Sequence, residues 1–404
     1  MKNIFILQNS QRPIEFNISK IFNPTNYRLH LITDSAGISN LTKEDRKYFN
    51  SIDVIDEFNE KLITQIIEDK RNIDTSFDII ATTEGAVSIC GKLRVKYGLQ
   101  DIDSERFINK IKMKDILKKY PLKIPKYILF DKKNYLYNPS TYLDDITSEL
   151  TFPIFAKPID QASCIGTEKI ETIESLKAWC KSNIASKFEF ELDEFIDGKL
   201  FHCDSYIKNG VIVHTNVSEC SRPCFDFLLG KTKGSIALPN NHKNYLKLRS
   251  YAEDALTALG TPQNGVTHLE IFETINSELV FLEVAHRSPG ILIPEMYRIS
   301  SGIDTREAHI LLSADDSYKI NVKSDFYSAW AAFPAVEGTI EKLYSPEISS
   351  QYKLSWYYQE GDKMMPAMKG RDHVGTILLW NKNYNQLKND FEFINNFCAY
   401  TLRQ

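Results

Sequence analysis

The feature that most constrains the fold is a pair of adjacent segments in which apolar and charged residues alternate. Residues 266–273 and 278–285 both show the period of two that is typical of half-buried β-strands, and Asn276-Ser277 separates them. If these two residues form a tight hairpin loop, Glu270 lies directly opposite Glu283. Opposed side chains have Cβ atoms about 4.5–5.5 Å apart, and two like charges there destabilise a hairpin by roughly 0.2–1 kcal/mol. The spacing therefore predicts two carboxylates in a position that a bare sheet disfavours.

A divalent cation between two carboxylates reverses their repulsion. Mg²⁺ accepts one or two carboxylates and keeps its other positions for water and phosphate oxygens. The same face carries His268 and Arg287, whereas the opposite face is apolar and is predicted to be core: Leu269, Ile271, Leu282 and Val284. The alternative is two ordinary glutamates on an exposed sheet, and the spacing alone does not decide between the two interpretations.

The first hundred residues alternate short apolar runs with helical patterns. The predicted strands are 4–7, 27–32, 52–55 and 77–81, and the predicted helices are 61–69 and 86–97. Such alternation favours a parallel α/β layer. No G-x-G-x-x-G follows the first run, so a dinucleotide site is not predicted there.

The rest of the chain mixes both patterns. The predicted strands are 126–130, 152–158, 188–196, 201–207 and 211–217, the last two joined by Asn209-Gly210, and the predicted helices are 113–120, 172–184, 245–259 and 304–312. Residues 131–145 are predicted to form a loop. The last ninety residues suggest a small β-rich subdomain, with strands near Trp330 and at 338–343, 354–358 and 375–379 and a helix at 384–397.

Composition excludes several classes of protein. A net charge of −4 argues against a nucleic-acid partner, and lysines 112, 114, 118 and 119 are interpreted as a solvated helix face. No apolar run reaches 18 residues, and the first one stops after Leu7, so neither a membrane span nor a secretory signal is expected. The 7 cysteines include no C-x-x-C pair, which favours reduced thiols in the cytoplasm. A zinc site at Cys220, Cys224 and His214 is disfavoured because such sites usually show a second tight pair.

Lys157 ends the apolar run Phe-Pro-Ile-Phe-Ala-Lys-Pro. Burying a lysine is costly unless an anion accompanies it. A loop of small residues, 161–166, follows, and its backbone N–H groups are suited to phosphate. No P-loop motif occurs, so a strand lysine with a mobile loop would be a different way to hold a triphosphate. The alternative is an edge-strand lysine that extends to water.

Taken in order, four stretches resemble the ATP-grasp superfamily: 109–125, 152–166, 192–198 and 268–290. Residues 202–206, 221–227 and 234–239 are similar to its carboxylate–amine ligase branch, which includes L-amino acid ligases. The resemblance implies an α/β (α+β) ATP-grasp fold. Its parts would be an N-terminal parallel α/β pre-ATP-grasp domain at 1–106, an ATP-grasp domain at 107–315 with its lid at about 120–190, and the β-rich subdomain at 316–404.

The resemblance also implies a role for each matching residue. Lys110 and Lys157 would bind the α- and β-phosphates of ATP, and Ser163 and Gly166 would cover the γ-phosphate. Glu270 and Glu283 would ligate Mg²⁺, or Mn²⁺ in its place. Arg287 would act with Lys157 in catalysis, stabilising the acyl-phosphate or orienting the acid. The remaining expected contacts are Glu194 and Ile196 with adenine, Asp193 and Asp204 near the ribose, and Arg222 with phosphate or carboxylate.

The chain departs from the family pattern at two positions. Ala285 stands where the second metal strand often has Asn, which favours a site for one Mg²⁺ over a full site for two. The alternatives are a second ion that is held less tightly, or His268 or water in place of the missing ligand. Leu200 stands where the hinge usually has an acidic residue, so a ribose contact there is not expected.

The implied activity is an ADP-forming ligase that joins a small carboxylate to an amine through an acyl-phosphate, with an amino acid as the amine. The alternatives are a catalytically silent nucleotide-binding scaffold and an ATP-dependent carboxylase. No nucleic acid or membrane partner is expected, and a homodimer is compatible with the resemblance. The sequence does not specify which acid and which amine react.

Overall fold

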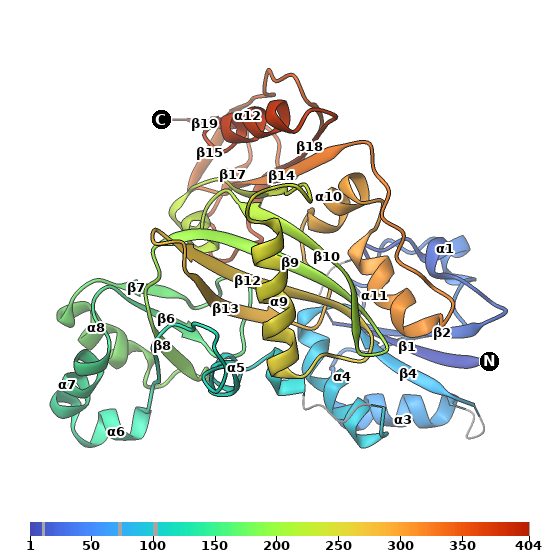
Figure 1. The fold of residues 1–404 in the computed structure, drawn as a ribbon, viewed down its shortest axis with the longest axis horizontal. Coiled ribbons are helices and arrows are strands. Elements are labelled where there is room, and N and C mark those ends of the chain that lie inside the picture. Colours follow the sequence, from blue (N-terminus) through green and yellow to red (C-terminus); the bar gives the residue numbers. More distant parts are fainter. Residues whose placement is uncertain (10–12, 72–74, 100–103, 404) are drawn as a thin grey trace.

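The computed structural model describes residues 1–9, 13–71, 75–99 and 104–403. Its N-terminal part is a parallel sheet of strand order β3-β2-β1-β4, made of β1 (Lys2–Gln8), β2 (Tyr27–Thr33), β3 (Ser51–Val54) and β4 (Phe77–Ala81) (Figure 1). The helices of this part are α1 (Ile18–Ile21), α2 (Lys43–Arg46), α3 (Glu60–Lys70) and α4 (Glu84–Lys96). Ile4 and Ile6 pack into one core cluster and Phe5 and Leu7 into another, so both faces of β1 are covered. The predicted parallel layer is confirmed.

A second, antiparallel sheet of order β5-β8-β6-β7 forms the part at the lower left of Figure 1. Its elements follow η1 (Ser104–Phe107) and α5 (Lys110–Leu117) and comprise β5 (Tyr127–Leu129), α6 (Lys132–Tyr137), α7 (Pro139–Glu149), β6 (Ile154–Pro158), β7 (Glu168–Ile170), α8 (Ile173–Asn183) and β8 (Phe190–Glu194). The predicted loop at 131–145 is wrong, because α6 and α7 lie there. Asp131 and Asn138 cap these two helices with their side chains, a signal that the polar composition of the segment obscured.

The largest sheet is antiparallel, with strand order β13-β12-β9-β10-β11-β14-β18-β16. Its first strands are β9 (Gly198–Lys208), β10 (Val211–Cys220), β11 (Lys233–Ala237), β12 (Gly265–Thr274) and β13 (Leu279–Ala285), with η2 (Cys224–Leu229) before β11. The Asn209-Gly210 hairpin is confirmed, and both residues have the positive φ, 51° and 75°, that a tight hairpin turn requires. Helix α9 (Tyr245–Leu259) covers one face, where Leu248, Ala252 and Leu256 share a core cluster with Phe201 and Leu269.

The C-terminal residues extend this sheet. Strand β14 (Tyr327–Pro334) pairs with β11, and β18 (His373–Asn381) and β16 (Gln351–Trp356) follow it. Strands β15 (Gly338–Leu343), β17 (Lys363–Met364) and β19 (Tyr400–Leu402) form a small separate sheet beside α12 (Tyr384–Ile394). The β-rich character is as predicted, and the domain boundary at 316 stays a prediction, since one sheet runs across it. No helix among the described residues has the length and apolar character needed to cross a membrane.

Two helices before the C-terminal strands, α10 (Ile293–Ser300) and α11 (Thr305–Ala314), connect the parts. Ile310 and Ala314 of α11 pack into an N-terminal core cluster. His309 of α11 accepts from the N–H of Val266 on β12 (2.9 Å), and its other ring nitrogen lies 3.0 Å from the carbonyl oxygen of Ala81 on β4. The imidazole therefore joins the N-terminal sheet to the central sheet.

This buried imidazole makes stability depend on pH. Burial, and then the neighbouring His286, lowers the pKa of His309 to about 3, well below the usual 6.5. The unfolded chain thus takes up the proton first, and stability is lost as the pH falls below about 6.5. At pH 5 this costs about 2 kcal/mol. His309→Gln keeps a donor and an acceptor but does not titrate, so we expect its urea midpoint to change less between pH 7 and pH 5 than that of wild type. Equal changes would contradict this role.

Candidate active site

The hairpin of β12 and β13 pairs Glu270 with Glu283, as predicted, but by a different route. The N–H of Thr274 donates to Glu278 O (2.9 Å), and Ser277 has φ 60°, so the loop is the three residues 275–277. A β-bulge at Leu282 then shifts the register back by one. The longer loop and the bulge shift the strand register by one residue each, in opposite directions. Glu270 and Glu283 therefore still lie opposite each other. The prediction that Leu282 is core is wrong, because the bulge turns it toward a pocket while Phe281 and Val284 pack inside.

Cationic side chains offset both carboxylates. Lys110 Nζ lies 3.1 Å from Glu283 Oε2, and His268 Nε2 lies 3.4 Å from Glu270 Oε1. Burial raises the pKa of Glu283, but Lys110 and Lys157 outweigh burial and hold it below its usual value. Burial likewise lowers the pKa of His268, but Asp204 and Glu270 outweigh it and raise the pKa to about 10. Glu283 is therefore held as an anion, which is the form that binds a cation, and the imidazole of His268 faces Glu270.

Lys157 belongs to a buried quartet of two lysines and two carboxylates. Its Nζ lies 2.9 Å from Asp193 and 3.3 Å from Glu191, and Lys114 Nζ lies 2.6 Å from Asp193 and 3.0 Å from Glu191. Burial lowers the pKa of Lys157, but the two carboxylates more than reverse this and raise it. The lysine is therefore charged and fixed in place at the end of β6.

The quartet corrects two expectations. Lys114 was interpreted as part of a solvated helix face, but its side chain is 0% exposed. Asp193 was expected near the ribose, but both of its oxygens accept from Lys114 at 2.6 and 2.7 Å. Its carboxylate is committed to the lysines, so we reassign Asp193 as a residue that positions Lys157. Sequence reasoning missed Glu191 because it lies within a predicted strand and carries no spacing signal.

An apolar pocket of about 220 Å³ lies between the β5-β8-β6-β7 sheet and the β12–β13 hairpin. Its charged end is formed by Lys110, Lys157, Glu270 and Glu283, and its apolar wall includes Phe155, Phe195, Ile196, Leu200, Phe225, Phe272 and Leu282. Glu194 also lines it, and its N–H donates to Lys126 O (2.8 Å). Because this N–H already has a hydrogen-bond partner, it is not available to adenine. A contact of adenine with the carbonyl of Glu194 and with the backbone of Ile196 stays a prediction.

A larger cavity of about 510 Å³ adjoins this pocket and shares residues 161–164, Glu270 and Glu283 with it. Its wall is formed by the N-terminus of α4, residues 287–291 and several polar side chains of the central sheet. Both kinds of charge face it: Glu15, Glu84, Lys233, Arg222, Arg287 and Arg306. The carboxylate pair thus lies where an apolar pocket meets a charged cavity.

Arg287 enters this cavity after β13 and forms an ion pair with Glu84 at the start of α4. Its Nη1 also donates to Ser288 O (2.9 Å). Burial lowers the pKa of Arg287, but Glu84 and then Glu283 outweigh it and raise it. Arg287, which the sequence predicted as a catalytic residue, therefore lines the larger cavity. Arg222 lies on the same wall, where its Nη2 donates to Asn396 Oδ1 (2.8 Å).

The predicted phosphate loop is fixed at two points. Lys110 Nζ donates to Gln161 O (2.7 Å), and the N–H of Gly370 donates to Ser163 O (2.8 Å). Ser163 and Gly166 have φ of 59° and 70°, left-handed values that let the loop turn within a few residues. The loop therefore contacts α5 through Lys110 and the connection between β17 and β18 through Gly370.

Lys233 is a functional candidate that the sequence did not reveal. It begins β11, is 9% exposed, lines the larger cavity and lies over the Phe227 ring at 4.7 Å. Within the described ranges it forms no ion pair. A buried ammonium without a carboxylate calls for an anionic ligand. Strand β11 itself was not predicted, which is why this lysine was not singled out.

Asp204 lies elsewhere than expected. It is 0% exposed, and its carboxylate accepts from His202 Nδ1 (2.7 Å), His268 Nδ1 (2.8 Å) and Tyr297 Oη (2.8 Å). Burial raises the pKa of Asp204, but His268 and His202 outweigh it and lower it. A carboxylate enclosed in this way cannot reach a ribose, so that prediction is wrong.

The disfavoured zinc site gains no support. Cys220 and Cys224 are free thiols, and His214 Nε2 lies 2.9 Å from Asn216 Oδ1. Among the described residues, the one group of His, Cys, Asp or Glu side chains close enough to hold a metal ion is His202, Asp204 and His268, which contains no thiol.

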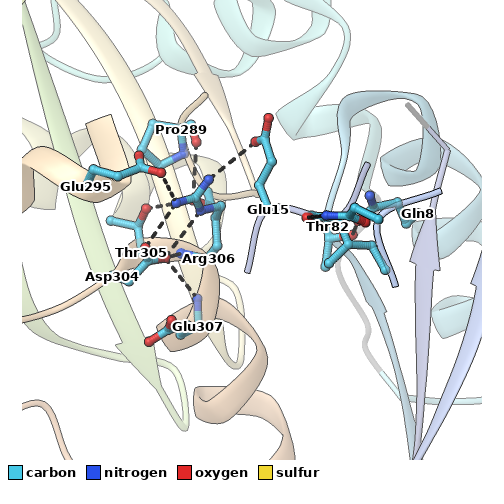
Figure 2. Close-up of polar contacts among 12 residues, drawn as sticks. Gln8, Glu15, Thr82, Pro289, Glu295, Asp304, Thr305, Arg306 and Glu307 are labelled. Atoms are coloured by element: carbon cyan, nitrogen blue, oxygen red, sulfur yellow. Dashed lines mark hydrogen bonds and ion pairs between the residues drawn. The ribbon is translucent and has the colours of Figure 1, made fainter. Parts of the chain in front are cut away.

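Arg306 of α11 lines the larger cavity. Figure 2 shows its side chain beside Glu295, Asp304 and Glu15. It donates to Glu295 Oε1 (2.5 Å) and Asp304 Oδ2 (3.1 Å) on its own part of the chain and to Glu15 Oε2 (3.3 Å) on the N-terminal part. Asp304 in turn caps α11 by accepting from the N–H groups of Arg306 and Glu307. This ion-pair network holds Glu15 at the edge of the cavity.

Known proteins resemble this chain in sequence and in fold. The family model described as D-ala D-ala ligase C-terminus matches residues 116–301. The L-arginine-specific L-amino acid ligase of Bacillus subtilis is 23% identical over 334 residues, which cover 77% of this chain and 76% of that protein. A D-alanine–D-alanine ligase of Natranaerobius thermophilus is 22% identical over 299 residues, covering 72% and 76%.

Solved structures agree in fold. The crystal structure of an L-amino acid ligase from Bacillus licheniformis has a TM-score of 0.73 at 17% identity, covering 100% of this chain and 99% of that one. A carboxyaminoimidazole ribonucleotide synthase from Aspergillus clavatus has a TM-score of 0.67 at 11% identity, covering 96% of each chain. The chain is therefore similar in sequence and in fold to carboxylate–amine ligases of the ATP-grasp superfamily, and the β5-β8-β6-β7 sheet, the lysines and the paired carboxylates follow one another in the order that this resemblance implies.

Proposed function

We propose that the protein is an ATP-dependent carboxylate–amine ligase that forms an amide bond and releases ADP and phosphate. The observation that carries this proposal is the position of Glu270 and Glu283, which lie at the junction of the apolar pocket and the charged cavity. Phosphoryl transfer needs a nucleotide on one side of a cation and an acceptor on the other. The two adjoining cavities provide those two places.

The apolar pocket suits adenine, and its charged end suits the phosphates. Aromatic and aliphatic side chains such as Phe195 and Leu282 offer flat contact surface, while Lys110 and Lys157 offer positive charge. The lysines would bind phosphate oxygens, and the backbone of residues 161–166 would cover the terminal phosphate. Asp193 and Glu191 hold Lys157 in one position, which reduces the reorganisation needed when ATP binds.

The donor set of the carboxylate pair fits a hard divalent cation. The carboxyl groups of Glu270 and Glu283 face each other across the hairpin, and oxygen ligands are the ones Mg²⁺ prefers. When bound there, Mg²⁺ neutralises phosphate charge and polarises the transferred group. Ala285, opposite His268, offers no side-chain ligand, which supports one tightly held ion rather than two.

The larger cavity would hold the acid and the amine. Arg287 and Lys233 are positioned to stabilise negative charge on the acyl-phosphate and on the oxyanion formed when the amine attacks. Glu15 and Glu84, which also line this cavity, suit an ammonium group. Side chains of both signs suit amino acids, and the amino-acid substrate in the name of the Bacillus subtilis relative supports an amino acid as the amine.

A screen of substrate pairs tests the proposal. Purified protein with Mg-ATP is offered pairs of amino acids and other small carboxylates, and phosphate release is followed together with the mass of the product. We expect phosphate release that needs both partners and a product lighter than their sum by one water. Release that depends on bicarbonate alone would indicate a carboxylase, and nucleotide binding without release for any pair would indicate a scaffold protein.

A further inference from the structure

A chain of hydrogen bonds among largely buried side chains runs along the wall of the larger cavity and ends at a proposed metal ligand. Trp330 Nε1 donates to Ser235 Oγ (2.8 Å), Ser235 Oγ lies 2.9 Å from His202 Nε2, and His202 Nδ1 lies 2.7 Å from Asp204. On the other side of Asp204, His268 Nδ1 lies at 2.8 Å. We call these five residues the Asp204 array. They come from strands β9, β11, β12 and β14, so the array is fixed by the central sheet itself.

The chemistry of its members fixes the direction of the array. An indole N–H can only donate, and a carboxylate such as Asp204 can only accept. Both histidines therefore present Nδ1–H to Asp204, and Ser235, which accepts from Trp330, is free to donate to His202 Nε2. The one ring nitrogen of the array that is not used internally is His268 Nε2. It lies 3.4 Å from Glu270 Oε1.

The ring of His268 cannot turn freely. A rotated ring would withdraw Nδ1–H from a carboxylate that is completely buried, and an unsatisfied buried polar group costs about 1–3 kcal/mol, more when charged. Tyr297 is a third donor to the Asp204 carboxylate and helps to fix its position. Its Oη also lies 2.7 Å from Ser218 Oγ. The direction of His268 Nε2 is therefore set by residues that do not themselves reach Glu270.

Glu270 needs such support because its cross-strand surroundings offer little. His202, which pairs with Glu270 on β9, uses both of its ring nitrogens within the array, and Lys110 contacts Glu283 rather than Glu270. We propose that His268, oriented by the Asp204 array, is a positioning residue that holds one oxygen of Glu270 and leaves the other directed at the cation. The proposal rests on the proposed function, because it assigns Glu270 to the metal.

Cation binding tests this role without relying on turnover. Binding of Mn²⁺ in the presence of ADP is measured from the electron paramagnetic resonance signal of free Mn²⁺. Loss of a residue that orients a metal ligand typically weakens the metal 10–100-fold, so we expect His268→Leu to weaken Mn²⁺ by at least about tenfold. His268→Gln retains an amide donor and should recover part of this loss. Asp204→Asn, which keeps the shape but disturbs the array, should also weaken Mn²⁺.

His214→Leu is the matched control, because His214 lies on β10, bonds to Asn216 and is not a member of the array. It should bind Mn²⁺ as wild type does. Unchanged Mn²⁺ binding in His268→Leu would overturn the inference. So would a variant whose affinity for ADP, measured without any cation, falls by the same factor as its affinity for Mn²⁺. Wild-type protein that binds no Mn²⁺ with ADP would instead contradict the proposed function from which the inference starts.

Discussion

Replacing Glu283 by alanine is expected to reduce amine-dependent ADP release by at least about a hundredfold, because it removes half of the carboxylate pair on which the cation depends. The substitution also leaves Lys110 without its carboxylate, 3.1 Å away. The freed lysine adds positive charge where the cation should bind. ADP release is measured at saturating acid, amine and Mg-ATP, so that a change in affinity is not mistaken for a change in rate.

Glu278→Ala is a suitable control for this experiment. Glu278 lies on the same hairpin at the edge of the loop, and its ion pair with Lys123 is exposed. An exposed pair of this kind contributes about 0–1 kcal/mol, so folding and rate should change little. A Glu283→Ala protein that released ADP as fast as Glu278→Ala would show that the carboxylate pair does not hold the cation.

The largest expected effect on stability comes from Lys114→Met. This change removes one of two lysines from the buried quartet and leaves Glu191 and Asp193 with Lys157 alone. Breaking a buried ion pair by removing one partner typically costs 3–5 kcal/mol, because a charge is left uncompensated. We therefore expect the urea midpoint to fall by an amount equivalent to about 3–5 kcal/mol.

Lys118→Met provides the matched control one helical turn later. Lys118 forms an exposed ion pair with Asp115, and its loss should cost less than about 1 kcal/mol. The double variant Lys114→Met/Glu191→Met removes one charge of each sign and should recover much of the stability. If Lys114→Met were no more harmful than Lys118→Met, the quartet would contribute little to the fold.

Strands and helices were predicted well where the spacing of apolar residues reflects which faces of the element are buried. Strand β1 contains the continuous apolar run Ile4–Leu7 because both of its faces are covered, and such a run is visible without knowledge of the fold. The helices at 132–149 were missed because they are short and polar and because their caps, Asp131 and Asn138, also occur in loops.

The Glu270–Glu283 pair was predicted correctly although two steps differed. A three-residue loop and a bulge at Leu282 compensate each other, and neither has a clear sequence signal because no glycine marks them. The bulge leaves the pairing of the two glutamates as predicted but changes the face toward which Leu282 points. Leu282 faces the apolar pocket, while the alternation rule placed it in the core.

The errors at Lys114, Asp193 and Asp204 share one physical cause. Each side chain meets a partner distant in sequence, as Lys114 meets Asp193 across 79 residues. Spacing along a helix or strand says which face a residue occupies, but not what packs against that face. Lys233 was missed for the same reason, since its burial depends on the neighbours of a strand that was not predicted.

The central claim is that a carboxylate is activated by phosphoryl transfer in the cavity beside Glu270 and Glu283. The most direct measurement uses the acid identified by the substrate screen with ¹⁸O in its carboxylate, and determines the mass of the phosphate released as the amide forms. Attack of a carboxylate oxygen on the terminal phosphorus leaves that oxygen on the phosphate once the amine displaces it. The account predicts one ¹⁸O in each phosphate released with ADP, and unlabelled phosphate, or release of AMP, would contradict it.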